Sequence, residues 1–472
     1  MKTGELSLDL SQLSGLMSLG ELLQSGDLAA IAVESGFICR SSSKLTGAAF
    51  LRLQSGFILP SKEWSLSDQC DYLEDEFGIS MVKQSLDGRY HTYAVSFMKR
   101  CYDILFSKIF TRDSVGIKAT FSHILLSDST TLKLPQGLFP FYESGGNNKG
   151  DSGLKINQTI DLQSFRIMDI QIWEGKVSDN NYEPSGSVNW GNNNLWLKDL
   201  GYYSFDTFVK IANAGDFFLS RYKTNTNLYV KGDNGEYVVL DMVGHLSKLG
   251  CGVHSRAIYI GKKKAKIGGR LVCEAVPEWV KAQRLQQYED SYKKQNFSNG
   301  SPKWEMTALK TYLCGYNLFI TNTTEAQLPN DSILLVYALR WQIELFFKIW
   351  KSLLFIDQVT QMNIFRLECF LYGRLIFLLL STEIMAFIKE AIADTDLDIE
   401  ISEWKTMKIL KKKMPLIIEY AMDNPVKLTE LLAQITQKVI RRAKKDKRKR
   451  EGRKNKVTPL STLKTLRKKA CE

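Results

Sequence analysis

The spacing of apolar residues changes twice along the chain. Residues 1–115 carry apolar positions three and four residues apart, which is typical of helices that bury one face. From residue 121 onward, alternating and short apolar runs bounded by turn-forming residues indicate strands. Beyond Leu354 the helical spacing returns and continues to about residue 440. The pattern therefore predicts a strand-rich centre between two helical regions.

The first helical region contains the outline of a helix-turn-helix. A helix over residues 65–77 opens on a capping-box pattern and stops at Gly78. A second, shorter helix follows within residues 80–88, and a longer one carries an apolar stripe over residues 94–109. In a helix-turn-helix the second of these helices would enter the major groove of DNA. A plain three-helix bundle fits the same pattern.

The central region predicts a recognisable order of elements. We expect strand, strand, strand, strand, helix and strand over residues 122–127, 154–160, 165–173, 195–197, 204–214 and 216–222. Three successive strands followed by strand and helix in alternation is the order of a ribonuclease-H-like core, so the fold class is α/β (α+β). A mainly β insertion with a basic hairpin tip interrupts this core, and a strand over residues 318–321 resumes it.

These patterns divide the chain into six expected parts. They are a helical DNA-binding domain, the first part of the core, the β-rich insertion, the end of the core, a C-terminal helical region and a basic tail, over residues 1–115, 116–222, 223–316, 317–355, 356–440 and 441–472.

Two aspartates follow predicted strands of the core. Asp128 comes directly after the first strand and Asp199 directly after the fourth, and these strands could be neighbours. Each aspartate could simply cap a turn. Asp206 and Asp216 are alternatives to Asp199, but Asp206 is expected inside a helix and Asp216 in a turn. We therefore expect Asp128 and Asp199 to lie at adjacent strand ends.

Residues 337–351 predict one helix late in the chain. At about 100° per residue, its polar side chains fall on a single narrow strip. The members of this strip are Tyr337, Arg340, Glu344, Lys348 and Lys351. Apolar residues cover most of the remaining circumference, so the helix should be largely embedded with its strip along a cleft. A ladder of salt bridges on a solvated face is the alternative interpretation.

The spacing within this strip resembles a known signature. Tyr337, Arg340, Glu344 and Lys351 match without a gap the YREK motif of the insertion-sequence-four family of bacterial DDE transposases. The Asp-x-Gly-Tyr segment that begins at Asp199 also looks like this family's second catalytic segment, and the family has an insertion at the same place. The resemblance implies a cut-and-paste transposase that nicks DNA, forms and resolves hairpins, and transfers a 3′-OH into target DNA.

The expected catalytic and metal-binding residues are Asp128, Asp199 and Glu344. In-line cleavage of a phosphodiester needs an activated oxygen nucleophile and neutralised charge on the leaving oxygen, which two Mg²⁺ ions about 4 Å apart can supply. Magnesium prefers oxygen ligands and keeps several waters, so a few converging carboxylates suffice. Manganese could substitute for magnesium. A ribonuclease-H-like nuclease that cuts without joining shares these features, and an inactive DNA-binding derivative is a further alternative.

The resemblance also implies contacts with DNA. Tyr337, Arg340 and Lys351 would bind phosphates at the transposon end, with Lys348 and Arg221 as additional candidates. The N-terminal domain would bind the terminal inverted repeats, and two copies would form a synaptic complex.

An aromatic side chain of the insertion would stack on a base flipped out of the duplex, as in related transposases. The candidates are Trp304, Tyr312 and Tyr316. The sequence does not choose among them.

Charge and composition add constraints. Of the net charge of +12, residues 438–456 carry +10, with 12 Lys or Arg and 2 Asp or Glu, so this segment is a DNA-binding arm or a solvated end. The 8 cysteines form no C-x-x-C pair and only 4 histidines are present, which argues against a zinc cluster. No signal peptide is evident, and the apolar residues 371–388 carry charges typical of a core helix. We expect a cytoplasmic protein without a membrane anchor.

Overall fold

The computed structural model describes two compact units, each assembled from separate stretches of the chain. The described residues are 9–24, 26–40, 42–55, 65–110, 120–145, 150–163, 166–184, 188–224, 226–250, 252–262, 265–299, 308–393 and 399–445. Unit 1 takes them from Met1–Gly116, Ser129–Val188 and Gln342–Lys454, and unit 2 from Ile117–Asp128 and Asn189–Trp341.

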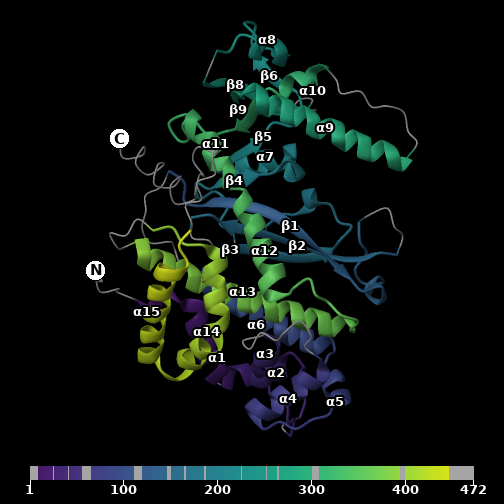
Figure 1. Cartoon of the computed structure of the whole chain (residues 1–472), viewed down its shortest axis with the longest axis vertical. Helices are drawn as coiled ribbons and strands as arrows, with labels where there is room; N and C mark the ends of the chain where they lie inside the picture. The colour runs from purple at the N-terminus through teal and green to yellow at the C-terminus, as the bar shows by residue number, and fades with distance from the viewer. Residues whose placement is uncertain are drawn as a thin grey trace. The chain divides into compact units, whose positions relative to one another are not determined.

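The strands form a mixed sheet. They are β1 (Ile124–Leu134), β2 (Ser152–Asp161), β3 (Ile167–Glu174), β4 (Leu195–Lys198), β5 (Phe217–Arg221), β6 (Leu228–Lys231), β7 (Tyr237–Val239), β8 (Val253–Lys262), β9 (Ala265–Ala275) and β10 (Tyr316–Thr321). Their order is β3-β2-β1-β4-β5-β10-β9-β8-β6-β7. Figure 1 labels most of these strands and colours each by its position along the chain. Strand β1 contributes residues 124–128 to unit 2 and residues 129–134 to unit 1.

Parallel pairing occurs at β4, near the centre of this order. β4 pairs in parallel with β1 and with β5, whereas β2 with β3, β5 with β10 and β10 with β9 are antiparallel. The predicted order of strands and helix in the core is confirmed, including the adjacency of β1 and β4. The strands of the predicted insertion do not form a sheet of their own, because residues 270–275 of β9 pair with the whole of β10.

Helices make up the described N-terminal and C-terminal regions, as predicted. The N-terminal helices are α1 (Ser14–Gln24), α2 (Gly26–Glu34), α3 (Gly47–Ser55), α4 (Leu66–Phe77), α5 (Lys83–Asp87) and α6 (Thr92–Phe110). Those of the centre are α7 (Phe205–Asn213), α8 (Met242–Leu246), α9 (Glu278–Asn299), α10 (Ala308–Leu313) and α11 (Asn330–Ala338). The chain then continues with α12 (Trp341–Leu354), α13 (Ile364–Ala393), α14 (Glu403–Asp423) and α15 (Pro425–Arg442).

Two helices of unit 1, α4 and α5, occupy the region of the predicted helix-turn-helix, and the motif itself stays a prediction. Ser65 and Asp68 form the capping box of α4, and Gly78 ends that helix in the left-handed conformation. Helix α5 begins at Lys83 and is followed by Gly88. α6 buries the expected stripe from Ala94 to Leu105. Whether α5 reads DNA stays a prediction.

Helix α13 forms the centre of the helical packing in unit 1. It packs against α1, α3, α6 and α14, and its residues 375–388 are almost completely buried. The prediction of a core helix over residues 371–388 is confirmed. Among the described helices, none alone has the length and apolarity to cross a membrane; α1 and α2 meet that test only as a pair bent by 82°. The predicted basic tail lies almost entirely outside the described residues.

Glu383 of α13 accepts hydrogen bonds at the start of α1. The backbone N–H groups of Gly15 and Leu16 donate to its carboxylate oxygens at 2.8 and 2.9 Å. These N–H groups belong to the first turn of a helix, where they have no partner within the helix. Burial nevertheless raises the pKa of Glu383 from 4.5 to about 6, because desolvation disfavours its charged form.

This pKa predicts a pH-dependent contribution to stability. The folded chain binds the Glu383 proton more tightly than the unfolded chain, so this contribution falls as pH rises through 4.5 to 6. Relative to Glu383→Gln, the wild-type chain should lose roughly 2 kcal/mol of unfolding free energy as the pH rises from 4.5 to 7. Urea unfolding at both pH values measures it, and a pH-independent difference would contradict the assignment.

Candidate active site

Strands β1 and β4 bring Asp128 and Asp199 into neighbouring positions of unit 2. The last paired residues of these parallel strands are Leu126 and Leu197, and each aspartate follows two residues later. The side chains between them continue the register, since Lys198 Nζ donates to Ser127 Oγ at 3.3 Å. Neighbouring strands lie about 4.8 Å apart, so two carboxylates at matched positions are close enough to share a ligand.

The prediction that β1 ends before Asp128 is wrong. β1 continues to Leu134, so Asp128 lies within the strand, and past residue 130 the side chains alternate between exposed and buried. Threonine is a good strand residue, which fits the continuation of β1 through Thr130 and Thr131. β4 ends at Lys198, whereas β1 also has β2 as a neighbour, so β1 can outlast its pairing with β4. Asp199 does follow the end of β4, as predicted.

Two side chains of the predicted signature meet Asp199. Tyr337 Oη donates a hydrogen bond to Asp199 Oδ1 at 3.3 Å, and Arg340 Nε lies 3.6 Å from the same oxygen. The Asp199 side chain keeps 36% exposure, so its carboxylate remains accessible to water. Burial and the nearby Asp199 carboxylate raise the pKa of the Tyr337 phenol. Tyr337 is therefore a neutral donor to the carboxylate at all physiological pH values.

The prediction of one continuous helix over residues 337–351 is wrong. α11 ends at Ala338 and α12 begins at Trp341. Between them, the N–H groups of Leu339 and Arg340 donate to carbonyls three residues back, which interrupts the α-helical ladder. Tyr337 and Arg340 thus belong to unit 2, whereas Glu344, Lys348 and Lys351 belong to unit 1.

Helix α12 has the two-sided character expected of it. Ile343, Phe346, Ile349 and Trp350 are fully buried, whereas Glu344 and Lys348 are exposed. Lys351 Nζ donates to the backbone carbonyl of Thr131 in β1 at 3.4 Å.

Lys348 contacts a different part of unit 1 from Lys351. Lys348 Nζ lies 5.7 Å from the centre of the Trp404 ring. Glu344 stands two helical turns before Lys351, on the same face of α12.

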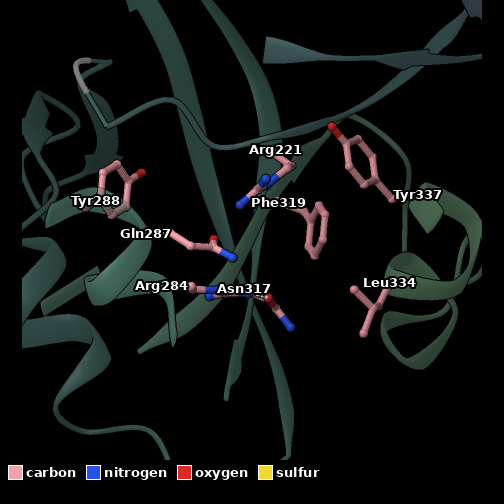
Figure 2. Close-up of a pocket in the computed structure, with 8 residues that line it drawn as sticks. All are labelled: Arg221, Arg284, Gln287, Tyr288, Asn317, Phe319, Leu334 and Tyr337. Carbon is pink, nitrogen blue, oxygen red and sulfur yellow. Dashed lines mark hydrogen bonds between the residues drawn. The ribbon is translucent and has the colours of Figure 1, made fainter. Parts of the chain in front are cut away.

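A pocket of about 510 Å³ opens within unit 2 (Figure 2). It is lined by Arg221, Arg284, Gln287, Tyr288, Asn317, Phe319, Leu334 and Tyr337. Figure 2 shows Arg221 of β5 and Gln287 of α9 extending into the same space. Burial and the Arg221 guanidinium both lower the pKa of Arg284, which means that two cations face one hollow. Such an arrangement favours an anionic ligand.

Two of the predicted base-stacking aromatics, Tyr312 and Tyr316, lie elsewhere in unit 2. Tyr312 and Tyr316 contact each other, with ring centroids 5.6 Å apart, and Tyr316 Oη donates to the Leu246 carbonyl at 3.4 Å. Trp304 lies outside the described residues. The pocket instead contains Tyr288, Phe319 and Tyr337.

Comparison with known proteins identifies the family. Residues 119–380, more than half of the chain, match the family described as Transposase DDE domain. The chain belongs to this family. It is an enzyme of the DDE transposase type, and such enzymes bind DNA and use divalent metal ions. The family resemblance seen in the sequence is confirmed.

Individual relatives resemble this transposase over most of its length. The transposase for insertion sequence element IS1151 of Clostridium perfringens is 29% identical over 84% of this chain and 86% of its own. The transposase for IS231B, from a subspecies of Bacillus thuringiensis, is 26% identical over 86% of this chain and 86% of its own. The transposase for IS231E, from another subspecies, is 28% identical over 79% of this chain and 79% of its own.

The residues of this transposase suit a divalent cation. Asp128 and Asp199 offer hard oxygen ligands from neighbouring strands, and an ion such as Mg²⁺ keeps several waters beside a few carboxylates. In the part of each unit that the structure describes, no three His, Cys, Asp or Glu side chains are gathered as a ready-made metal site. The third ligand, predicted as Glu344, therefore stays a prediction.

Several residues around the site were not predicted. Lys198 is buried directly before Asp199, and Arg284, Gln287 and Tyr288 come from α9. The sequence of α9 is polar without a clear apolar stripe, so no burial pattern indicated its inner face. A four-residue spacing of Arg284 and Tyr288, which puts both on one helical face, was the available signal.

Proposed function

We propose that this chain is the cut-and-paste transposase of a bacterial insertion sequence. It would bind the terminal inverted repeats of its element as a homodimer, cleave the ends, and join the released 3′-OH groups to target DNA. The observation that carries the proposal is the convergence of Tyr337 and Arg340 on Asp199. Side chains of the transposase signature and a strand-end aspartate meet there, in a chain that belongs to the DDE family.

Asp128, Asp199 and Glu344 are the proposed metal ligands and catalytic residues. They would hold two Mg²⁺ ions, or Mn²⁺ in their place, as part of a ribonuclease-H-like core. When bound, such ions activate an oxygen nucleophile and neutralise charge on the leaving oxygen. The parallel pairing of β1 with β4, beside the antiparallel pair β2 and β3, supports this core.

The neighbouring side chains orient the carboxylates and bind phosphate. Tyr337 donates to Asp199 as a neutral phenol, which fixes the direction of the carboxylate. Arg340 balances the charge of Asp199 and, by its planar guanidinium, suits a DNA phosphate oxygen. Lys351 and Lys348 would contact further phosphates along α12.

Other parts of the chain would recognise the element's ends. Helices α4 and α5 within residues 65–88 are the proposed sequence-reading elements, and Lys83 on α5 is exposed. The pocket at Arg221 and Arg284 would take a phosphate of the end DNA, because a phosphate would relieve the repulsion between the two guanidiniums. Contacts between the two copies would come from the helices after residue 355.

Replacing Arg221 tests the pocket's role. We expect Arg221→Gln to weaken binding of the element's end DNA about tenfold and to lower the slope of log affinity against log salt by about one. Fluorescence anisotropy at several salt concentrations measures both. The matched control is Arg256→Gln, which removes an exposed arginine of β8 near His245 and should change neither value. If both variants weaken DNA binding equally, Arg221 contributes only through the net positive charge of the chain and makes no specific phosphate contact.

A joining assay tests the function itself. The full-length chain is incubated with Mg²⁺, a labelled duplex bearing the element's terminal repeat, and a supercoiled target plasmid. We expect cleavage at the repeat and covalent transfer of the labelled 3′ end into the plasmid. Cleavage without transfer would indicate a nuclease, and binding without cleavage would indicate an inactive DNA-binding protein.

A further inference from the structure

Lys198 is a fully buried lysine next to the proposed metal site. It is the last residue of β4, it is 1% exposed, and Asp199 follows it directly. Its Nζ donates to Ser127 Oγ at 3.3 Å, and Ser127, also fully buried, directly precedes Asp128. One hydrogen bond thus connects the residues immediately before the two aspartates.

The surroundings of Lys198 fit a charged ammonium. Its Nζ lies 4.8 Å from the centre of the Trp196 ring and 5.9 Å from that of Tyr202, and aromatic faces attract cations. Trp196 is itself fixed, because its Nε1 donates to buried Asp216 at 3.1 Å. Removing a lysine from water costs several kcal/mol, whereas a methionine or leucine would fill similar space without that cost. A requirement beyond filling the core therefore favours lysine here.

The position of the bond suggests that requirement. Backbone register between β1 and β4 ends at Leu126 and Leu197, and β1 then remains beside β2 while β4 passes into a 3-10 turn. The two aspartates lie just beyond the last paired residues, where backbone pairing alone no longer fixes their separation. The bond from Lys198 to Ser127 continues the connection one residue further.

We infer that Lys198 is a positioning residue that holds the ends of β1 and β4 together and so sets the separation of Asp128 and Asp199. The inference rests on the proposed function, since it requires that the two aspartates share a metal ion. Replacing a residue that supports and orients a metal ligand typically lowers metal affinity about ten- to a hundredfold.

Manganese binding to the full-length chain tests this inference. Mn²⁺ is titrated in the absence of DNA and followed by electron paramagnetic resonance, with melting temperature measured on the same samples. We expect Lys198→Met to raise the Kd for Mn²⁺ about tenfold. Ser127→Ala, which keeps the lysine charge, should raise it several-fold, and Ser127→Thr, which keeps the hydroxyl, should stay near wild type.

A matched control separates positioning from stability. Thr321→Val removes another buried bond between strands of unit 2, from Thr321 Oγ1 to the Phe218 carbonyl at 2.6 Å. It should lower the melting temperature without changing the Kd for Mn²⁺. If Lys198→Met leaves the Mn²⁺ affinity unchanged, Lys198 only fills space in the core. If Lys198→Met binds Mn²⁺ more tightly, Lys198 acts only by repelling the metal cation. Either result overturns the inference.

The same titration distinguishes failure of the proposed function. Asp199→Asn should weaken Mn²⁺ binding strongly. If wild type and Asp199→Asn bind Mn²⁺ alike, the metal assignment is wrong, and the inference about Lys198 is overturned with it. If Asp199→Asn weakens binding but Lys198→Met and Ser127→Ala do not, only the inference about Lys198 is wrong.

Discussion

Asp199→Asn should slow cleavage of the element's end at least about a thousandfold, equivalent to about 4 kcal/mol of lost transition-state stabilisation. Asparagine has the shape of aspartate but lacks the charge that a divalent cation requires. It can still accept the Tyr337 hydrogen bond, so the local structure should persist. Affinity for the end DNA should stay within a few-fold of wild type. Gel analysis of labelled ends and fluorescence anisotropy measure the two quantities.

Asp206→Asn is the matched control for this prediction. Asp206 lies in the first turn of α7, seven residues after Asp199, and is exposed. The Asp206→Asn variant should cleave the element's end at the wild-type rate. Loss of cleavage in Asp206→Asn with full activity in Asp199→Asn would move the second acid to α7 and contradict the assignment.

Glu344→Gln should cause a comparable loss of cleavage with end binding retained. Glu344 is exposed on a helix whose opposite face is fully buried, so the substitution leaves the packing of α12 unchanged. The melting temperature should therefore match that of wild type. We expect the cleavage rate to fall because the amide of glutamine lacks the negative charge of a carboxylate ligand. The same gel analysis of labelled ends measures this rate.

The control for Glu344 is an exposed glutamate of the same unit. Glu419→Gln on α14 makes the same chemical change and should retain full cleavage and joining. If Glu344→Gln also retains them, the third acid lies elsewhere and the polar strip of α12 only binds DNA.

The order of elements was predictable because local patterns determine it. The apolar run 195–197 followed by Asp199 placed that aspartate at a strand end, and the capping box at Ser65 located the start of α4. The adjacency of β1 and β4 followed from the element order. For Asp199 and for the start of α4, the residues that carry the signal are close in the sequence.

The errors have a common physical origin in contacts between distant residues. The length of β1 beyond Asp128 depends on β2 as a neighbour, which the Ser-Thr run does not reveal. The break before Trp341 contains neither glycine nor proline, and Arg340 beside it contacts Asp199 from far along the chain. The pocket and buried Lys198 likewise depend on strands and helices meeting in three dimensions.

The most direct test asks whether the carboxylates act as one unit. Cleavage and joining with Mg²⁺ are measured for wild type, Asp128→Asn, Asp199→Asn, Glu344→Gln and the double variant Asp199→Asn/Glu344→Gln. We predict that each single variant loses both reactions and that the double variant is no slower than either of its singles, because groups that act together are not additive. Full activity in any single variant, or losses that multiply in the double variant, would contradict a shared metal site.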